Sequence, residues 1–179
     1  GSGIEDINLS VKDFLYKVNS ELVGNITNIA SRVAGMLNKS FDGVIGEMDE
    51  EGRALYEKCV AAAPQIGDFY EGREFSLAVQ TVIRLADDVN KYVDNKKPWA
   101  LLKENAGECH KVLSAVLNCF KNFMIYLKPV LPKYVTDAEA ILNVKPLGWR
   151  DIAAPLSGHK INEFKPLMVR IEQEKIDGM

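Results

Sequence analysis

The fold of this chain follows from the pattern in one stretch, VKDFLYKVNSELVGNITNIASRVAGML, residues 11–37. Its apolar residues recur every three or four positions, as on one face of an α-helix. They are Val11, Phe14, Leu15, Val18, Leu22, Ile26, Ile29, Val33, Met36 and Leu37. Ser10 suits the N-cap, and the turn residues after Phe41 end the pattern near Lys39. The stretch therefore predicts one long amphipathic helix.

The rest of the sequence divides into further helical segments. We expect helices over about residues 50–63, 72–93, 109–127, 130–142 and 164–176. Pro64 bends or ends the first of these, and the third, 109–127, is apolar over the widest arc and should be the most buried. No stretch alternates as a half-buried strand does. The expected fold is all-α, an antiparallel helix bundle of about five helices.

Length and composition fit one compact domain. The chain has 179 residues, of which 47% are hydrophobic, enough for one substantial core. The first three residues, 1–3, are interpreted as an expression scar, which leaves 4–179 as the domain. No apolar run reaches the roughly 20 residues that span a bilayer, so we expect no membrane contact.

Cysteine usage and net charge restrict the partners. Cys59, Cys109 and Cys119 are odd in number and lack C-x-x-C spacing, which favours buried thiols in a reducing cytoplasm over disulfides or a zinc site. The net charge of -3 argues against non-specific nucleic-acid binding, which depends on Lys and Arg. Any RNA binding must be local, through a few unstacked bases.

The sequence holds no recognisable catalytic set. His110 and His159 are the only histidines and lie far apart, and His110 is interpreted as a helix-surface residue. Asp87 and Asp88 are neighbours in a helix and point about 100° apart, which suits a solvated face. The acidic run 48–51 fits the start of a helix. We expect neither a catalytic residue nor a metal site.

One polar strip accompanies the long helix. Asn25, Asn28 and Arg32 are spaced three and four residues apart, along the flank of the apolar face. Their amides and guanidinium can hydrogen-bond the edges of single-stranded bases. Solvation of an ordinary helix face explains the same spacing, and the pattern alone favours that reading.

Tryptophan placement leaves two alternatives open. Trp99 follows Pro98 at the first turn of a helix, where it either offers a stacking platform or packs between helix ends. Trp149 is interpreted as a packed anchor of an irregular stretch. Asn90 either caps a helix interior or faces the same pocket as Trp99.

Several segments together resemble the C-terminal anticodon-binding domain of bacterial methionyl-tRNA synthetase, a class I aminoacyl-tRNA synthetase. The likeness covers essentially the whole chain after residue 3, and its order and spacing are specific. The segments are NIASR (28–32), LNKSFDG (37–43), NKYVDNKKPW (90–99), YLKPVLPK (126–133) and GHKINEFK (158–165).

The resemblance implies an anticodon site. The tryptophan at Trp99 would stack on the first anticodon base, and Asn28 and Arg32 would help to recognise the CAU anticodon. The secondary RNA-contact candidates are Asn25, Asn38, Lys39 and Asn90. Ser40 departs from the basic residue often found in the family at that position, which puts a backbone contact there in doubt.

The resemblance also implies a parent enzyme. This would be a cytoplasmic methionine–tRNA ligase of protein biosynthesis, which uses ATP to attach methionine to initiator and elongator tRNA. The HIGH-type and KMSKS-type signatures of its catalysis are missing from these residues. The catalytic part would therefore lie elsewhere, with ATP and, as a further option, zinc as its cofactors. This fragment would be non-catalytic and without cofactor, and the segment from Gly158 onward would pack its tail against that catalytic domain. DNA is not an expected partner.

Two other functions remain open. One is the anticodon-binding domain of another class I synthetase, because such domains share pieces of these segments. The other is a helical interaction bundle with no role in RNA binding, which the negative net charge favours.

Overall fold

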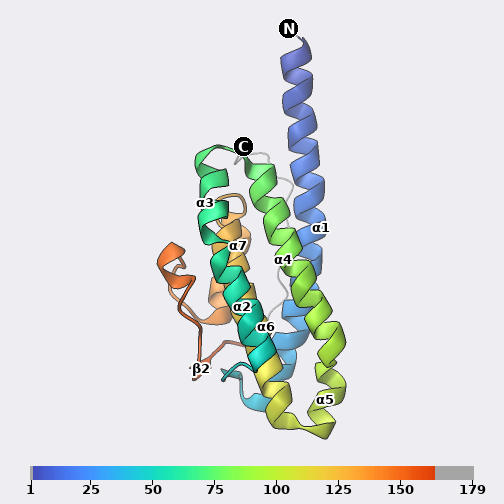
Figure 1. The fold of residues 1–179 in the computed structure, drawn as a ribbon, viewed down its shortest axis with the longest axis vertical. Coiled ribbons are helices and arrows are strands. Elements are labelled where there is room, and N and C mark those ends of the chain that lie inside the picture. Colours follow the sequence, from blue (N-terminus) through green and yellow to red (C-terminus); the bar gives the residue numbers. More distant parts are fainter. Residues whose placement is uncertain (1, 164–179) are drawn as a thin grey trace.

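The computed structural model describes the backbone of residues 2–163, and the side chains of residues 12, 13, 16, 17 and 20–163. Its helices are α1 (Ser2–Phe41), α2 (Glu50–Ala61), α3 (Ala63–Glu71), α4 (Phe75–Lys96), α5 (Pro98–Glu104), α6 (Ala106–Leu127) and α7 (Pro132–Leu142) (Figure 1). A 3₁₀ turn (Trp149–Asp151) and strands β1 (Val44–Ile45) and β2 (His159–Lys160) complete the described chain. The all-α helix bundle is confirmed. The segment 164–176, predicted as a helix, lies outside the described residues.

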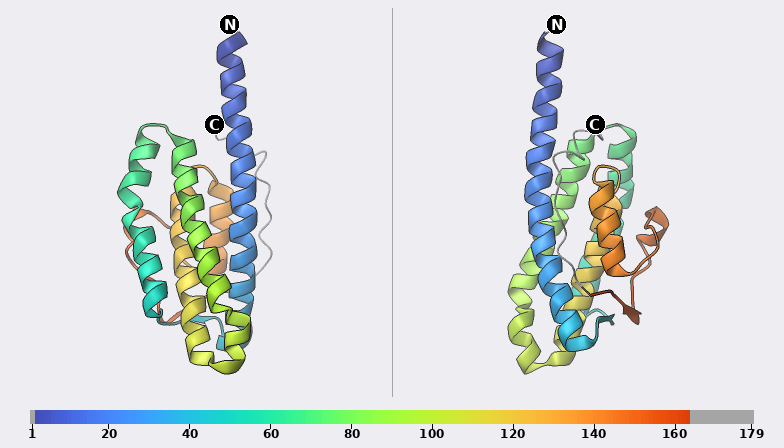
Figure 2. Two further views of the ribbon diagram at one scale, coloured as in Figure 1. Left: turned by 45° about the vertical axis from the view of Figure 1, so that its right-hand side comes forward. Right: turned by 180° about the vertical axis from the view of Figure 1, so that it is seen from behind.

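The longest helix, α1, starts earlier than its apolar pattern. Ser2 begins it, so the prediction of a start capped by Ser10 is wrong, and two of the residues set aside as a scar are helical. No proline interrupts residues 2–41, and a helix that has formed extends at little cost. The first turns of α1 project beyond the bundle (Figures 1 and 2).

Pro64 divides what the sequence presents as one helical region. It occupies the first turn of α3, where proline's fixed φ and missing N–H are tolerated. Asp49 caps α2 by accepting a hydrogen bond from the Gly52 N–H, at 2.8 Å. The interpretation of the acidic run 48–51 as a helix start is therefore confirmed.

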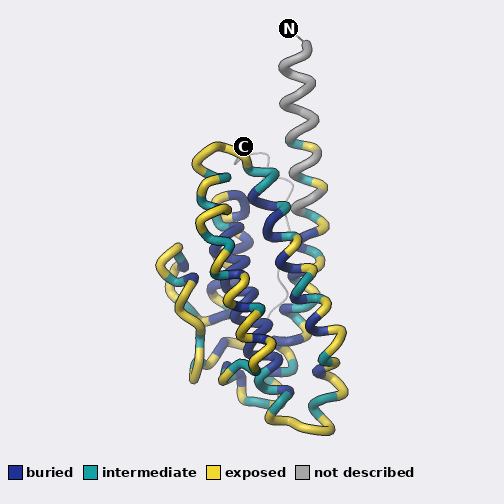
Figure 3. The backbone as a smooth tube through the Cα atoms, viewed as in Figure 1, coloured by how far each residue is buried: buried dark blue, intermediate teal, exposed yellow. Residues whose placement is uncertain are grey.

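The central helix is α6, as predicted. Its residues 112–127 are all buried, and it contacts α1, α2, α4, α5 and α7. Figure 3 shows this buried segment running through the middle of the bundle. The thiols of Cys59, Cys109 and Cys119 are free and buried, which agrees with the sequence.

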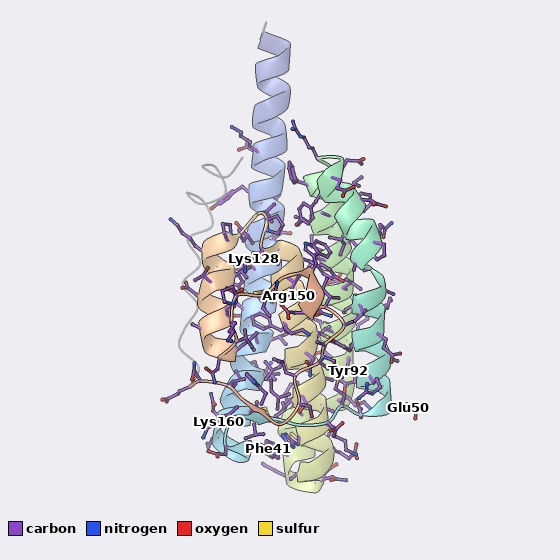
Figure 4. All side chains as sticks on the ribbon, turned by 90° about the vertical axis from the view of Figure 1, so that its left-hand side faces the viewer. Phe41, Glu50, Tyr92, Lys128, Arg150 and Lys160 are labelled. Atoms are coloured by element: carbon purple, nitrogen blue, oxygen red, sulfur yellow. The ribbon has the colours of Figure 1, made fainter. Side chains whose placement is uncertain are left out.

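A polar stripe on α6 holds the irregular segment 149–157 against the helices. Lys121 is 1% exposed and donates hydrogen bonds to the backbone oxygens of Asp151 and Ala154, at 2.6 and 2.5 Å. The Asn118 side chain bonds both the N–H and the C=O of Leu156. In Figure 4 the segment around Arg150 crosses the face of the bundle. These partly buried bonds fix a chain segment whose only regular structure is one 3₁₀ turn.

The structure has a small sheet that the sequence does not reveal. Strands β1 and β2 pair antiparallel, with Val44 opposite Lys160 and Ile45 opposite His159. Each strand has only two residues, which is too short for an alternating pattern to be visible. Residues 158–161 thus pack on this chain's own bundle.

Two side chains differ from the sequence interpretation. His110 is half-buried, stacks on the Phe41 ring with centroids 4.5 Å apart, and places Nε2 2.6 Å from the Val44 oxygen. It is not a free surface residue, because the turn after α1 folds back over it. Trp149 is 43% exposed, although its ring contacts that of Tyr126 at 5.5 Å.

None of the described helices is long and apolar enough to cross a membrane.

Candidate nucleic-acid interface

The polar strip of α1 faces solvent beside a buried face. Asn25, Asn28 and Arg32 are exposed, whereas Ile26 and Val33 are buried in the core. The 3.6-residue repeat of the helix places these two sets side by side. The strip is therefore fixed by the packing of α1 against α4 and α6.

A sharp corner between α4 and α5 presents Trp99. Lys97 adopts a left-handed conformation with φ of 49° and donates its N–H to the Val93 oxygen. A residue before proline avoids the right-handed helical region, so α4 ends at Lys96 with Lys97 as its C-cap. Pro98 then opens α5 in its first turn, and Trp99 follows at once.

Buried contacts hold this corner in place. The thiol of Cys109 donates to the Pro98 oxygen at 3.3 Å. Near the end of α4, the Tyr92 hydroxyl donates to the carboxylate of Asp49 at 2.6 Å, and Lys96 lies 3.5 Å from the same carboxylate. Burial, with the Asp49 hydrogen bond, raises the pKa of Tyr92 well above its usual value. The end of α4 is thereby tied to the start of α2.

The strip on α1 and the corner after α4 meet at one place. The guanidinium carbon of Arg32 lies 4.5 Å from the centroid of the Trp99 ring, a cation–π contact. Trp99 is 41% exposed, so the structure favours a partly exposed platform over a fully packed tryptophan. The pocket around the pair is lined by Ile29, Arg32, Val33, Met36, Val93, Pro98 and Trp99. Its apolar members were not among the sequence candidates, because as core-face residues they look like packing.

Arg32 has hydrogen-bonding capacity to spare. Among the described residues its guanidinium makes neither an ion pair nor a hydrogen bond, and it contacts the Trp99 ring alone. The guanidinium group has five N–H donors and is always charged. Such a group can bind acceptor atoms on the edge of an incoming ligand.

Asn90 lies in a neighbouring pocket. That pocket shares Ile29 with the Trp99 pocket and is otherwise lined by residues of α1, α4 and α6. The Oδ1 atom of Asn90 is buried and has no hydrogen-bond partner in the described structure. Asn90 therefore borders the Trp99 pocket without lining it.

Asn38 and Lys39 belong to a different groove. They line it together with Gly35, Asp42, Lys160, Ile161 and Glu163. Lys160 reaches this groove through the pairing of β1 with β2, and its Nζ lies 3.3 Å from Asp42. The structure thus does not bring Asn38 and Lys39 to the Trp99 ring. Lys160 lies in the family-like segment 158–165 but was not a site candidate, because no local pattern reveals the short sheet that brings it here.

Asp88 and His159, two of the ionisable side chains that the sequence offers, make structural contacts within the described chain. No cluster of three or more His, Cys, Asp or Glu side chains occurs among the described residues. Asp88 forms an ion pair with Lys58 at 2.6 Å, and His159 Nε2 lies 2.7 Å from the Leu142 oxygen. The Trp99 and Arg32 pair can stack on a flat ring and donate hydrogen bonds to its edge.

Comparison with known proteins relates the chain to part of one kind of enzyme. It is 46% identical over 178 residues to the methionine–tRNA ligase of Psychrobacter sp. (strain PRwf-1). The match covers 98% of this chain but only 25% of that relative, so the chain spans about a quarter of the relative's length. No family model matches the chain.

Solved structures show the same fold. The apo methionyl-tRNA synthetase of Mycobacterium tuberculosis matches with a TM-score of 0.79 and 19% identity, over 86% of this chain and 33% of that one. The same enzyme bound by methionyl-adenylate matches with a TM-score of 0.78 over 87% of this chain. At this identity the match supports the arrangement of the helices alone.

Proposed function

We propose that this chain, a homologue of one quarter of a methionine–tRNA ligase, is the part of such an enzyme that binds the tRNA anticodon. The observation that carries the proposal is the contact between the exposed Trp99 ring and the guanidinium of Arg32, which has no hydrogen-bond partner among the described residues. A ring of this kind stacks on an unpaired base, and the guanidinium binds the base edge. Asn28, one helical turn before Arg32 and also exposed, supplies a further amide.

The proposal extends to the parent protein. Its remaining three quarters would carry the catalytic domain, which uses ATP to attach methionine to initiator and elongator tRNA in the cytoplasm. The fragment described here would select the tRNA by its CAU anticodon and contribute no reacting group. Asn25, two helical turns before Arg32 on α1, and Asn90, which lines the neighbouring pocket, would support the bases that follow.

A titration of anticodon stem-loops tests the proposal. We expect the chain to bind a CAU loop more tightly than loops with U, A or G at the first anticodon position. Every loop shares the same stem and phosphates, so a difference in affinity reports base recognition. Equal affinities for all four loops would exclude anticodon reading and leave a helical interaction bundle as the alternative. Preference for another anticodon would indicate a different class I synthetase.

A further inference from the structure

In the free chain Arg32 occupies one face of the Trp99 ring. Its guanidinium lies over the Trp99 ring at 4.5 Å from the centroid. A nucleobase that stacks on this face needs the same space, because stacked rings and cations approach an aromatic face at similar distances. A base can therefore stack on this face only if Arg32 leaves it.

We propose that Arg32 gates the Trp99 platform and thereby selects the base. When a base displaces the Arg32 guanidinium, the free energy of the cation–π contact with Trp99 is lost. A base offsets this loss only if its own edge forms hydrogen bonds with the displaced guanidinium. The gate rests on the proposed anticodon function and adds a property to it. Arg32 would disfavour wrong bases, besides favouring the right one.

The chemistry of the four bases makes cytosine the best occupant. On its Watson–Crick edge cytosine offers two adjacent acceptors, N3 and O2, which match the two parallel N–H groups of a guanidinium. Uracil and guanine place an N–H donor at the centre of this edge, where it meets the N–H groups of Arg32. Adenine offers one acceptor, N1. Because Arg32 has no other hydrogen-bond or ionic partner among the described residues, no second interaction has to break when it moves.

Gating of the Trp99 ring by Arg32 predicts other changes in loop affinity than simple recognition of the correct base does. If Arg32 only bonded the correct base, its removal would weaken binding of the CAU loop and leave mismatched loops unchanged. If it also covers the ring, its removal frees the platform for every base. Exposed cation–π contacts of this kind correspond to a change of about two- to five-fold in affinity.

A first experiment examines the covered ring without RNA. In a Trp149→Phe background, Trp99 is the only tryptophan and its fluorescence reports its own exposure. We expect acrylamide to quench Trp99 more efficiently after Arg32→Ala than before. Lys39→Ala, which removes another exposed α1 cation that does not line the Trp99 pocket, should leave the quenching unchanged. Equal quenching in all three proteins would overturn the gate.

A second experiment measures selection. Stem-loops with C, U, A, G or no base at the first anticodon position are titrated into the wild type, Arg32→Ala and Lys39→Ala. The abasic loop corrects for lost charge, because it keeps the phosphates and has nothing to stack. Relative to it, we expect Arg32→Ala to bind the U, A and G loops about two- to five-fold more tightly than the wild type does, and to lose its preference for C. Mismatched loops that stay unchanged while C loses affinity would overturn the gate and leave the anticodon function standing. Failure of the wild type to bind any loop would remove both.

Discussion

At the scale of single residues, Lys121 places a charged side chain inside the core of the bundle. Its ammonium is almost fully buried and donates to the Tyr56 hydroxyl and to two backbone oxygens. Burial lowers the pKa of Lys121 from 10.5 to about 8. The hydrogen bonds keep the segment 149–157 in place, while the lost hydration opposes the charge.

This shift predicts how stability depends on pH. Between pH 8 and 10.5 the unfolded chain binds more protons at Lys121 than the folded chain does, so this residue makes folding more favourable as pH rises through that window. Comparing wild type with Lys121→Met in urea unfolding cancels the other titrating groups. We expect the unfolding free energy of the wild type, minus that of Lys121→Met, to increase by up to about 1.4 kcal/mol per pH unit in this window. A constant difference from pH 7 to 11 would contradict this reading.

Residue-level prediction from sequence succeeded where a residue acts locally and failed where it acts across the fold. The exposure of Arg32 and Asn28 follows from helix periodicity, and the special position of Trp99 follows from the Lys97-Pro98 corner. The Phe41 and His110 stack was missed, because it joins the end of α1 to the start of α6. No local pattern encodes such a contact.

At the scale of elements, the start of α2 is tied to the end of α4. Asp49 caps α2 through Gly52 and also accepts from Tyr92. We expect Asp49→Ala to lower the unfolding free energy by about 2–4 kcal/mol, the sum of a lost cap and a stranded buried hydroxyl. Glu50→Ala is the matched control in the same turn and should cost only a few tenths of a kcal/mol. Equal shifts of the melting temperature in both variants would contradict a stabilising role for the Asp49 contacts between α2 and α4.

The predicted elements show why apolar periodicity has limits. The helices α1, α4 and α6 were predicted from their stripes, and their observed spans agree apart from the ends of the helices. In α6 the apolar arc correctly indicated burial. The same helix, however, uses Ser114, Asn118 and Lys121 to bind segments that lie outside the α-helices. A sequence pattern marks these residues as polar interruptions without showing what they bind.

At the scale of the whole molecule, an acidic chain is proposed to bind an anion. The net charge of -3 leaves little long-range attraction, so binding should depend on a few local cations such as Arg32, Lys39 and Lys97, all of which are exposed. We expect log affinity for the CAU loop to fall with log salt at a slope of about -2, that of about three phosphate contacts on a single strand.

Substitution of Lys39 tests whether RNA binding depends on these local cations. Because it lines the groove shared with Lys160 and lies outside the Trp99 pocket, Lys39→Ala should weaken all loops alike and reduce the salt slope by about 1. Lys145→Ala, an exposed cation in the segment after α7, is the control and should change neither. If Lys39→Ala altered the preference among first bases, Lys39 would have to contact a base.

The whole fold was predictable as an all-α bundle, and its RNA face was only partly so. Periodicity places the strip of α1, but the distance between Arg32 and Trp99 depends on how α1 packs against α4. The groove with Lys160 depends on a strand pair of two residues each. Both features arise from long-range packing, which a local pattern does not encode.

The proposed site depends on one tryptophan, and the chain provides its own control. Trp99 and Trp149 are similarly exposed, at 41% and 43%, but only Trp99 lies beneath Arg32. The decisive measurement is the affinity of Trp99→Ala and Trp149→Ala for the CAU stem-loop, with a thermal melt of each. We predict that Trp99→Ala loses about 1–3 kcal/mol of binding free energy and that Trp149→Ala binds as the wild type does. Unchanged affinity of a folded Trp99→Ala, or equal losses in both variants, would contradict the proposed site.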